Sequence, residues 1–423
     1  MNIKYYRFFK NISVIPFFVI LIMLTNIDCL SQVRDLNFYI QSAYKNSPVL
    51  YENNKLISSY QTEKDLIYSE LRKPRIYGTA NYLFAPSIND YGYDSATTNG
   101  GLYSALLNVD FPLFNGYELD TRLEEAGVEQ NTYRNSINME RHDIDKEITD
   151  LYLAALQDQE QIKLEDEIIN ILSYQRDVLK ALISRGAGKV ADYSLLDVEY
   201  QDQILNKNQL EASFQSDLMT LNLSAGINDT AILPIQETKL MLADTTVQSS
   251  QFLESFMLDS LRLINEQKSN EINYKPQIDF FINGGLNAVT YTDIHKKFGV
   301  STGFNLTFSL YNGNQLEKKN FLVKIRQDIV SSQKNYFANQ NEIRKRNIKN
   351  EIIDREKLLV QLKKQEDNYR VLLDLFKKEF SSGEVSVIDY INVLKNYISF
   401  KTEFIQNKYR HMKSINEFNY WNW

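Results

Sequence analysis

The sequence predicts an internally duplicated α+β membrane protein with long antiparallel coiled-coil hairpins, which form an α-barrel, and four β-strands per chain. Three observations support this class. A stretch with the same spacing of Phe, Leu, an aromatic residue and Asn-Gly occurs twice, at 108–119 and 305–316. Strand-like alternation precedes each copy, and helical periodicity follows it. No proline lies between Pro112 and Pro234 or after Pro276, so two stretches of over a hundred residues can be uninterrupted helix.

Equivalent residues of the two copies lie 197 positions apart over a long part of the chain. The matched pairs are Gly186 and Gly383, Asp192 and Asp389, Tyr193 and Tyr390, and Tyr200 and Tyr397. No insertion separates the matches, so the helices between them should have equal length. An internal duplication with paired geometry requires this.

The chain divides into a leader, two repeats and a connector. Residues 1–31 have the pattern of a signal peptide, with three basic residues, an apolar core of sixteen residues and a small-residue cleavage site. The only cysteine, Cys29, either leaves with this segment or is acylated there, so no disulfide, zinc cluster or thiol nucleophile is expected. The first repeat is predicted at 32–226, the connector at 227–250 and the second repeat at 251–423.

Each repeat is predicted to contain a helix, two strands, a long helix and a return helix. In the first repeat the strands are expected at 75–85 and 102–114, the long helix at 117–184 and the return helix at 191–226. In the second repeat the strands are expected at 277–290 and 298–311, the long helix at 314–381 and the return helix at 387–420. The junctions Asn115-Gly116 and Asn312-Gly313 should each start a long helix.

The predicted strands have one apolar and one polar face. This alternation is typical of a strand between lipid and an aqueous lumen, although a soluble amphipathic hairpin would look the same. Asp110 falls on the polar face, where a solvated carboxylate is expected. Four strands cannot close a membrane barrel, and an open edge in lipid would leave unpaired backbone groups. Three copies would supply twelve strands, so we expect a homotrimer in outer membrane lipid.

The long helices show heptad periodicity. In the first one, apolar residues recur at spacings of 3, 4 and 7 from Ile137 to Leu179. In the second one, Ile325, Ile329, Tyr336 and Ile343 continue a similar seam. At 1.5 Å per residue, 68 residues extend roughly 100 Å, which no compact core of this size accommodates.

Four motifs together resemble the TolC-like outer membrane efflux proteins. They are Ala43-x-x-Asn46-x-Pro48-x-Leu50, the strand-to-helix Phe-x-Leu-Phe-Asn-Gly, a Gly-x5-Asp at each hairpin tip, and Leu221-x4-Gly226. The resemblance covers essentially all of the mature chain. It implies a passive trimeric duct in the outer membrane that extends into the periplasm. It also implies docking to a periplasmic adaptor (membrane fusion) protein and an inner-membrane RND or ABC transporter, in efflux or type I secretion.

The resemblance also implies a periplasmic gate. Acidic side chains six positions after each tip glycine narrow the mouth of these ducts, and here they are Asp192 and Asp389. Three copies of Asp389 around one axis would repel one another and favour bound cations. A second acidic ring falls on Asn392, and the usual tyrosine and basic contacts fall on Phe380 and Val385, so the polar lock should differ. The alternative is that Asp192 and Asp389 are helix N-cap residues.

The hairpin tips are the expected docking site of the adaptor. The residues concerned are Arg185, Gly186, Gly188, Ser382 and Gly383. Their alternative role is that of simple turn residues, because glycine commonly ends a helix.

The composition favours neither catalysis nor nucleic-acid binding. The net charge is −7, and no phosphate-binding loop, catalytic triad or metal-binding spacing occurs, so no cofactor is expected and the chain is not predicted to be an enzyme. His142, His295 and His411 are the only histidines, and the two in heptad helices are expected on solvated faces. The alternative function is an exported periplasmic coiled-coil adaptor or scaffold protein.

Overall fold

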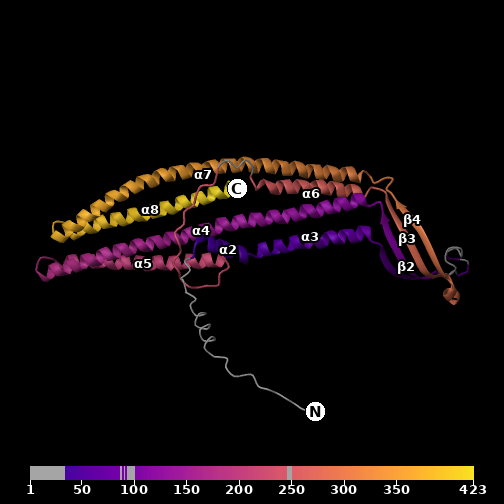
Figure 1. Cartoon of the computed structure of the whole chain (residues 1–423), viewed down its shortest axis with the longest axis horizontal. Coiled ribbons are helices and arrows are strands. Elements are labelled where there is room, and N and C mark those ends of the chain that lie inside the picture. The colour runs from indigo at the N-terminus through magenta and orange to yellow at the C-terminus, as the bar shows by residue number, and fades with distance from the viewer. Residues whose placement is uncertain (1–33, 86–87, 90, 93–100, 245–249) are drawn as a thin grey trace, which may run out of the picture.

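The computed structural model describes residues 34–85, 88–89, 91–92, 101–244 and 250–423. The predicted signal peptide and Cys29 lie outside the described residues. The molecule is an elongated helical body with a β-sheet at one end and two helical hairpin tips at the other (Figure 1). The C-terminus lies near the middle of the body (Figure 1).

The order helix, two strands, long helix and return helix occurs twice along the chain, with the additional helix α2 in the first set and the short η1 in the second. The first set is α2 (Leu36–Asn46), α3 (Pro48–Arg72), β1 (Arg75–Phe84), β2 (Gly101–Leu113), α4 (Gly116–Ser184) and α5 (Val190–Ser224). The second set is α6 (Leu253–Ile272), β3 (Gln277–Ala288), the short 3-10 helix η1 (Tyr291–Lys296), β4 (Phe298–Thr307), α7 (Gln315–Ser382) and α8 (Val387–Trp421). The long helices have 69 and 68 residues, and the return helices α5 and α8 both have 35.

The break between α2 and α3 has a local cause and a long-range partner. Ser47 leaves the helical conformation, its hydroxyl accepts a hydrogen bond from Leu50 N, and Pro48 starts the new helix. The side chain of Asn46 donates to the carbonyl oxygens of Ala225 and Gly226, at 3.0 Å each. The early Asn motif and the late glycine motif therefore form one contact, which joins the start of the described chain to the end of α5.

The four strands form one antiparallel sheet in the order β1-β2-β3-β4. The register pairs apolar residues with apolar residues across the strands, for example Ile76 with Val109 and Phe280 with Phe304. Ile76, Val300 and Phe304 on this face are each more than half exposed. A contiguous exposed apolar face of this kind normally meets another protein or a membrane.

Two strands end at least two residues earlier than the sequence predicted. The second strand of the second hairpin, expected at 298–311, ends at Thr307, and β3, expected at 277–290, ends at Ala288. Thr307 pairs with Gln277, the first residue of β3, and the residue before it is Pro276. Proline has no N–H group to extend a ladder, so the residues after Thr307 lose their partner within the chain.

The helix α4 carries most of the helical core. It packs against α3 and α6 toward the sheet and against α5 and α8 toward the tips. Eighteen of its residues are buried, and they include Ile148, Ala155, Leu172 and Leu179 of the predicted seam. A heptad seam that meets neighbours on two sides explains this burial.

The predicted seam of the second long helix is not buried in the chain. Ile325, Ile329, Tyr336 and Ile343 of α7 are 41 to 69 % exposed. The helices α6 and α8 cover other faces of α7, where Val323 and Ile352 are buried, and α7 runs along one long side of the body (Figure 1). The periodicity predicts the helix correctly, but the apolar stripe faces away from the rest of the described chain.

Within the described residues, no helix combines the length and hydropathy needed to cross a membrane.

Candidate pore-lining surfaces

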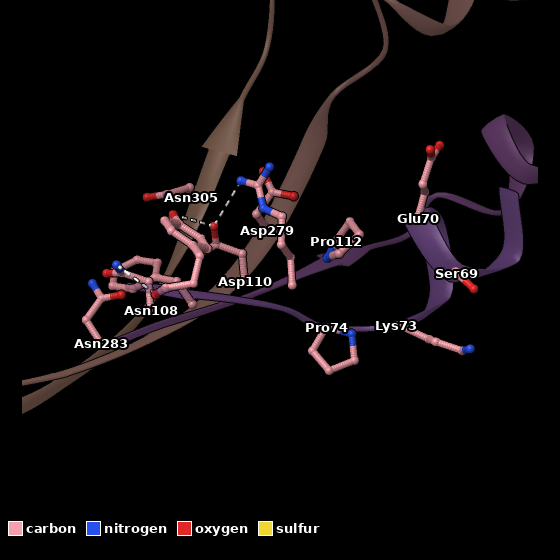
Figure 2. A pocket seen from close by; sticks show the side chains of 13 residues that line it. Ser69, Glu70, Lys73, Pro74, Asn108, Asp110, Pro112, Asp279, Asn283 and Asn305 are labelled. Carbon is pink, nitrogen blue, oxygen red and sulfur yellow. Dashed lines mark hydrogen bonds and ion pairs between the residues drawn. The ribbon is translucent and has the colours of Figure 1, made fainter. Parts of the chain in front are cut away.

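The polar face of the sheet and the end of α3 border a cavity of about 890 Å³ (Figure 2). Its strand residues all come from the face opposite the exposed apolar one, because side chains alternate along a strand. The lining residues include Glu70, Lys73, Arg75, Tyr77, Asn108, Asp110, Asp279, Asn283 and Asn305. This surface combines charged groups of both signs with amides, which suits an aqueous lumen.

Asp110 has partners that the sequence did not indicate. The Tyr77 hydroxyl donates to Asp110 Oδ2 at 2.8 Å, and Arg75 lies 3.4 Å from the same oxygen (Figure 2). Arg75 is directly opposite Asp110 in the β1–β2 register. The carboxylate lies at the cavity surface as expected, but it is also paired with Arg75 and Tyr77, and only the strand register could have shown this pairing.

Both hairpin tips turn at a glycine with left-handed backbone. Gly186 has φ +74° and Gly383 has φ +79°. At the first tip, Ala187 N donates to Leu182 O at 2.9 Å, and at the second, Glu384 N donates to Glu379 O at the same distance. These bonds close the helix ends in the manner of a Schellman motif, where glycine is favoured because it lacks a Cβ.

The other tip residues are mostly exposed. Arg185 and Ser382 are exposed, and the Ser382 hydroxyl donates to Glu379 O at 3.0 Å. Gly188 is different, because a Cβ there would lie 2.9 Å from the Ile183 side chain. The two tips therefore present exposed polar surface, with Gly188 packed against the last turn of α4.

The predicted gate aspartates are not N-cap residues. The helix α8 is capped by Ser386, whose hydroxyl accepts from Asp389 N at 3.2 Å and lies 2.6 Å from Asp389 Oδ2. Asp389 is thus in the first turn of α8, where its backbone N–H is held by the side chain of the N-cap residue Ser386. Asp192 lies in the first turn of α5 after Lys189. The Ser-x-x-Asp spacing before an apolar run could have identified Ser386 from the sequence.

The remaining gate candidates separate into exposed and buried positions. Asn392 and Asp389 are exposed on α8, and Asp192 is half-buried. Phe380 is buried and stacks on Tyr390, with ring centroids 4.9 Å apart. The structure therefore places Phe380 inside the second hairpin, where an aromatic ring without a hydroxyl is readily accommodated, rather than on a pore surface.

The two strand-to-helix junctions differ in geometry. Asn115 caps α4, which begins at Gly116, and its amide donates to Leu71 O. In the second copy Gly313 and Asn314 are both left-handed, and α7 begins at Gln315. Asn312 O accepts from Gln315 N at 3.2 Å. The two Asn-Gly pairs are thus equivalent in sequence, but α7 begins two positions later than α4 relative to its Asn-Gly pair.

The histidines are packed more closely than predicted. His142 stacks against Tyr420 and Trp423, with centroid distances of 4.7 and 4.2 Å. His411 is half-buried, and burial lowers its pKa. The expectation that both lie on solvated faces is wrong, while His295 is exposed in η1. In the part of the chain that the structure describes, no group of three or more His, Cys, Asp or Glu residues could hold a metal ion.

Two buried glutamates in the helical body have opposite environments. Burial opposes ionisation of Glu366, but hydrogen bonds from Lys363 and Lys401 outweigh it and lower its pKa to about 2. Glu165 Oε2 has no hydrogen-bond partner among the described residues, and burial raises the pKa of Glu165 to about 7. The sequence alone does not distinguish Glu366 and Glu165 from the exposed glutamates of the heptad helices.

No protein-family model matches the sequence. A search of curated proteins gives no significant match.

Solved structures resemble this chain closely in fold. The CmeC outer membrane channel of Campylobacter jejuni has a TM-score of 0.71 at 12 % identity, over 92 % of this chain and 85 % of that one. The outer membrane protein VceC of Vibrio cholerae has a TM-score of 0.71 at 13 % identity, over 92 % and 96 %. The open state of the MtrE outer membrane channel of Neisseria gonorrhoeae has a TM-score of 0.67 at 12 % identity, over 92 % and 88 %. The helical body, four-stranded sheet and two hairpin tips therefore make up the fold of the TolC-like outer membrane channels.

Proposed function

We propose that this chain is the outer membrane exit duct of a tripartite efflux or type I secretion system. The observation that carries the proposal is the two-faced sheet at one end of the helical body. Its apolar face is exposed, and its polar face borders a hydrophilic cavity. This combination is typical of strands between lipid and a water-filled lumen. The likeness to outer membrane channels supports it.

The duct is proposed to be a homotrimer. Within the described residues, β1 and β4 each have a strand partner on one side only. A membrane sheet needs closure, because unpaired N–H and C=O groups cost several kcal/mol each in lipid. Three copies would join β4 of one chain to β1 of the next in a twelve-stranded barrel. Two helical repeats per chain would then continue the lumen into the periplasm, as an internal duplication would allow.

The proposed partners are those that a passive duct would need. A passive duct needs an energy source elsewhere, so we propose a periplasmic adaptor at the exposed hairpin tips and an inner-membrane RND or ABC transporter beyond it. The predicted leader would direct export of the chain across the inner membrane. The exported scaffold remains the alternative, and it would leave the apolar face of the sheet without lipid contact.

Adjacent residues on opposite faces of β4 test the membrane assignment. Val300→Asp should reduce the amount of protein in the outer membrane fraction, because a charge on the lipid face is unfavourable near the midplane, although Asp costs less than the roughly 2–4 kcal/mol of Arg or Lys. Ser301→Asp is the matched control, since Ser301 is paired with Asn283 on the polar face and should leave the amount unchanged. The measurement is membrane fractionation with quantitative blotting. Equal effects of both variants, or wild-type protein in the soluble fraction, would favour the scaffold.

Two variants at the N-terminus of α8 test the proposed gate, because they separate the charge of Asp389 from the helix cap formed by Ser386. Asp389→Asn removes a charge from each chain, so the cation preference of single channels in planar bilayers should fall toward none. Ser386→Ala removes the cap and should cost about 1 kcal/mol of stability, while the ion selectivity stays unchanged. If Asp389→Asn has wild-type selectivity, the acidic gate does not exist and Asp389 only stabilises the helix.

A further inference from the structure

The two helical hairpins of the chain have opposite charge. The helices α4 and α5 together contain 22 Asp and Glu but only 8 Lys and Arg. The helices α7 and α8 together contain 13 Asp and Glu and 21 Lys and Arg. Alternating heptad faces would explain high charge in both hairpins but not this separation of sign, so an acidic hairpin and a basic hairpin are joined in one chain.

The contact between the hairpins uses this difference. Lys408 of α8 lies 2.9 Å from Glu160 of α4, and both side chains are about one-third exposed. Lys395 of α8 lies 2.7 Å from the buried carboxylate of Glu199 in α5. One pair, Lys146 with Glu417, has the reverse sense. The basic return helix thus lies against the acidic hairpin, with ion pairs across the contact.

Because the two repeats are equivalent in sequence, the contact between α4 and α8 has an equivalent contact, whose residues are exposed in the single chain. A shift of 197 residues converts α4 into α7 and α5 into α8, so the α4–α8 contact corresponds to α7 against α5 of another copy. Figure 1 shows α7 along one long side of the body and α3 and α5 along the other. The pair Glu160 and Lys408 becomes Lys357 and Glu211, with the charges exchanged.

Both residues of the exchanged pair are accessible in the single chain. The side chain of Lys357 is 70 % exposed and that of Glu211 is 50 % exposed. Their ion pairs are with residues of their own helices, Asp354 and Lys207. Such pairs are weak, so both groups can exchange them for a partner across an interface.

Near the sheet, an ion pair within the chain is equivalent to an apolar pair between copies. The Lys-Pro pairs at 73–74 and 275–276 set a shift of 202 between α3 and α6. The ion pair between Lys268 of α6 and Glu124 of α4 then corresponds to Leu66 of α3 and Phe321 of α7. Leu66 and Phe321 are both exposed in the single chain. The contact within the chain and the contact between copies therefore differ in chemistry along their length, which disfavours pairing of the wrong hairpins.

We propose that α7 of one copy docks against α5 and α3 of a second copy, with Lys357 paired to Glu211 and Phe321 packed on Leu66. The inference rests on the proposed trimeric duct and names the surface that closes it. The partner is a second copy because the basic α7 side and the acidic α5 side are complementary in charge, and because the exposed stripe of α7 continues between the two contacts. Six hairpins of alternating sign would then surround one lumen.

Charge exchange tests the proposal. Lys357→Glu and Glu211→Lys should each weaken trimer association by at least about tenfold, because each places like charges in contact. The double variant should restore association, and raised salt should weaken the wild type but relieve the single variants. Trimer and monomer are measured by light scattering and analytical ultracentrifugation in detergent over a dilution series. Circular dichroism verifies that the variants fold, as expected for exposed positions.

A matched control and a proximity test complete the design. Lys378→Glu makes the same charge change on α7 at a position whose equivalent, Ala181, is exposed in the chain, and it should leave association unchanged. Lys357→Cys with Glu211→Cys should cross-link to covalent trimers with a short bismaleimide, and Lys357→Cys alone should not. A monomeric wild type would overturn the duct itself. A trimeric wild type that neither responds to the exchange nor cross-links would overturn this interface and leave the duct standing.

Discussion

Glu366→Ala should lower the free energy of unfolding by about 3–5 kcal/mol at neutral pH. Glu366 is buried in α7 and accepts hydrogen bonds from Lys363 at 2.6 Å and from Lys401 at 2.5 Å. Lys401 is itself mostly buried, so removing the carboxylate leaves a positive charge without compensation. Breaking a buried pair from one side typically costs this much. The measurement is denaturant unfolding in detergent, followed by circular dichroism.

The pH dependence gives this prediction a definite sign. The pKa of Glu366 is about 2 in the folded chain, below its ordinary value of 4.5. A lowered folded-state pKa means that the contribution is present above pH 4.5 and disappears as the pH falls through about 2. The difference between wild type and Glu366→Ala should therefore shrink in acid. Asp367→Ala, at the exposed neighbouring position, should change stability by less than about 0.5 kcal/mol, and an equal loss there would refute the role of burial.

Gly226→Ala should destabilise the protein by about 2–4 kcal/mol. Gly226 has φ +66°, where a side chain costs roughly 1–2 kcal/mol. An added Cβ would also lie 2.5 Å from the Asn46 side chain. Asn46 would have to move and give up its two hydrogen bonds to Ala225 O and Gly226 O, each worth about 1 kcal/mol. The expected readout is a lower unfolding midpoint with unchanged far-UV circular dichroism at low temperature.

Gly127→Ala serves as the control for the glycine prediction. Gly127 lies inside α4, and a Cβ there meets no described atom within 4 Å. Alanine has the higher helix propensity, so this variant should be more stable by about 0.5–1 kcal/mol. Opposite signs at the two positions would separate the packing and backbone effect at Gly226 from a general effect of adding a methyl group. If both variants stabilise the protein, the contact between Asn46 and Gly226 does not contribute to its stability.

Exposed apolar surface occurs at three places that the proposed trimer would cover or place in lipid. They are the outer face of the sheet, the stripe on α7, and the α3 and α5 side. A protein that stays monomeric in water would expose an apolar, aggregation-prone surface at all three places. The same surfaces would instead be buried by neighbouring copies and by lipid in a closed duct. The proposed assembly would thus account for the exposed heptad stripe of α7, whose partner would be a neighbouring copy.

Local residue patterns were sufficient to predict the elements and their order. The heptad spacing identified α4 and α7, the alternation identified four strands, and Gly186 and Gly383 marked the hairpin tips. These features depend on backbone preferences and side-chain periodicity within a few turns or strand residues, which the sequence contains directly.

Contacts between distant residues were decided only by the tertiary structure. The register placed Arg75 beside Asp110, and the return of α8 placed Lys401 beside Glu366. Packing also put Phe380 inside its hairpin and left the Ile325 stripe uncovered. A single heptad or strand face looks the same whether it meets its own chain, another copy or lipid, because periodicity specifies which side chains share a face and not what lies against it.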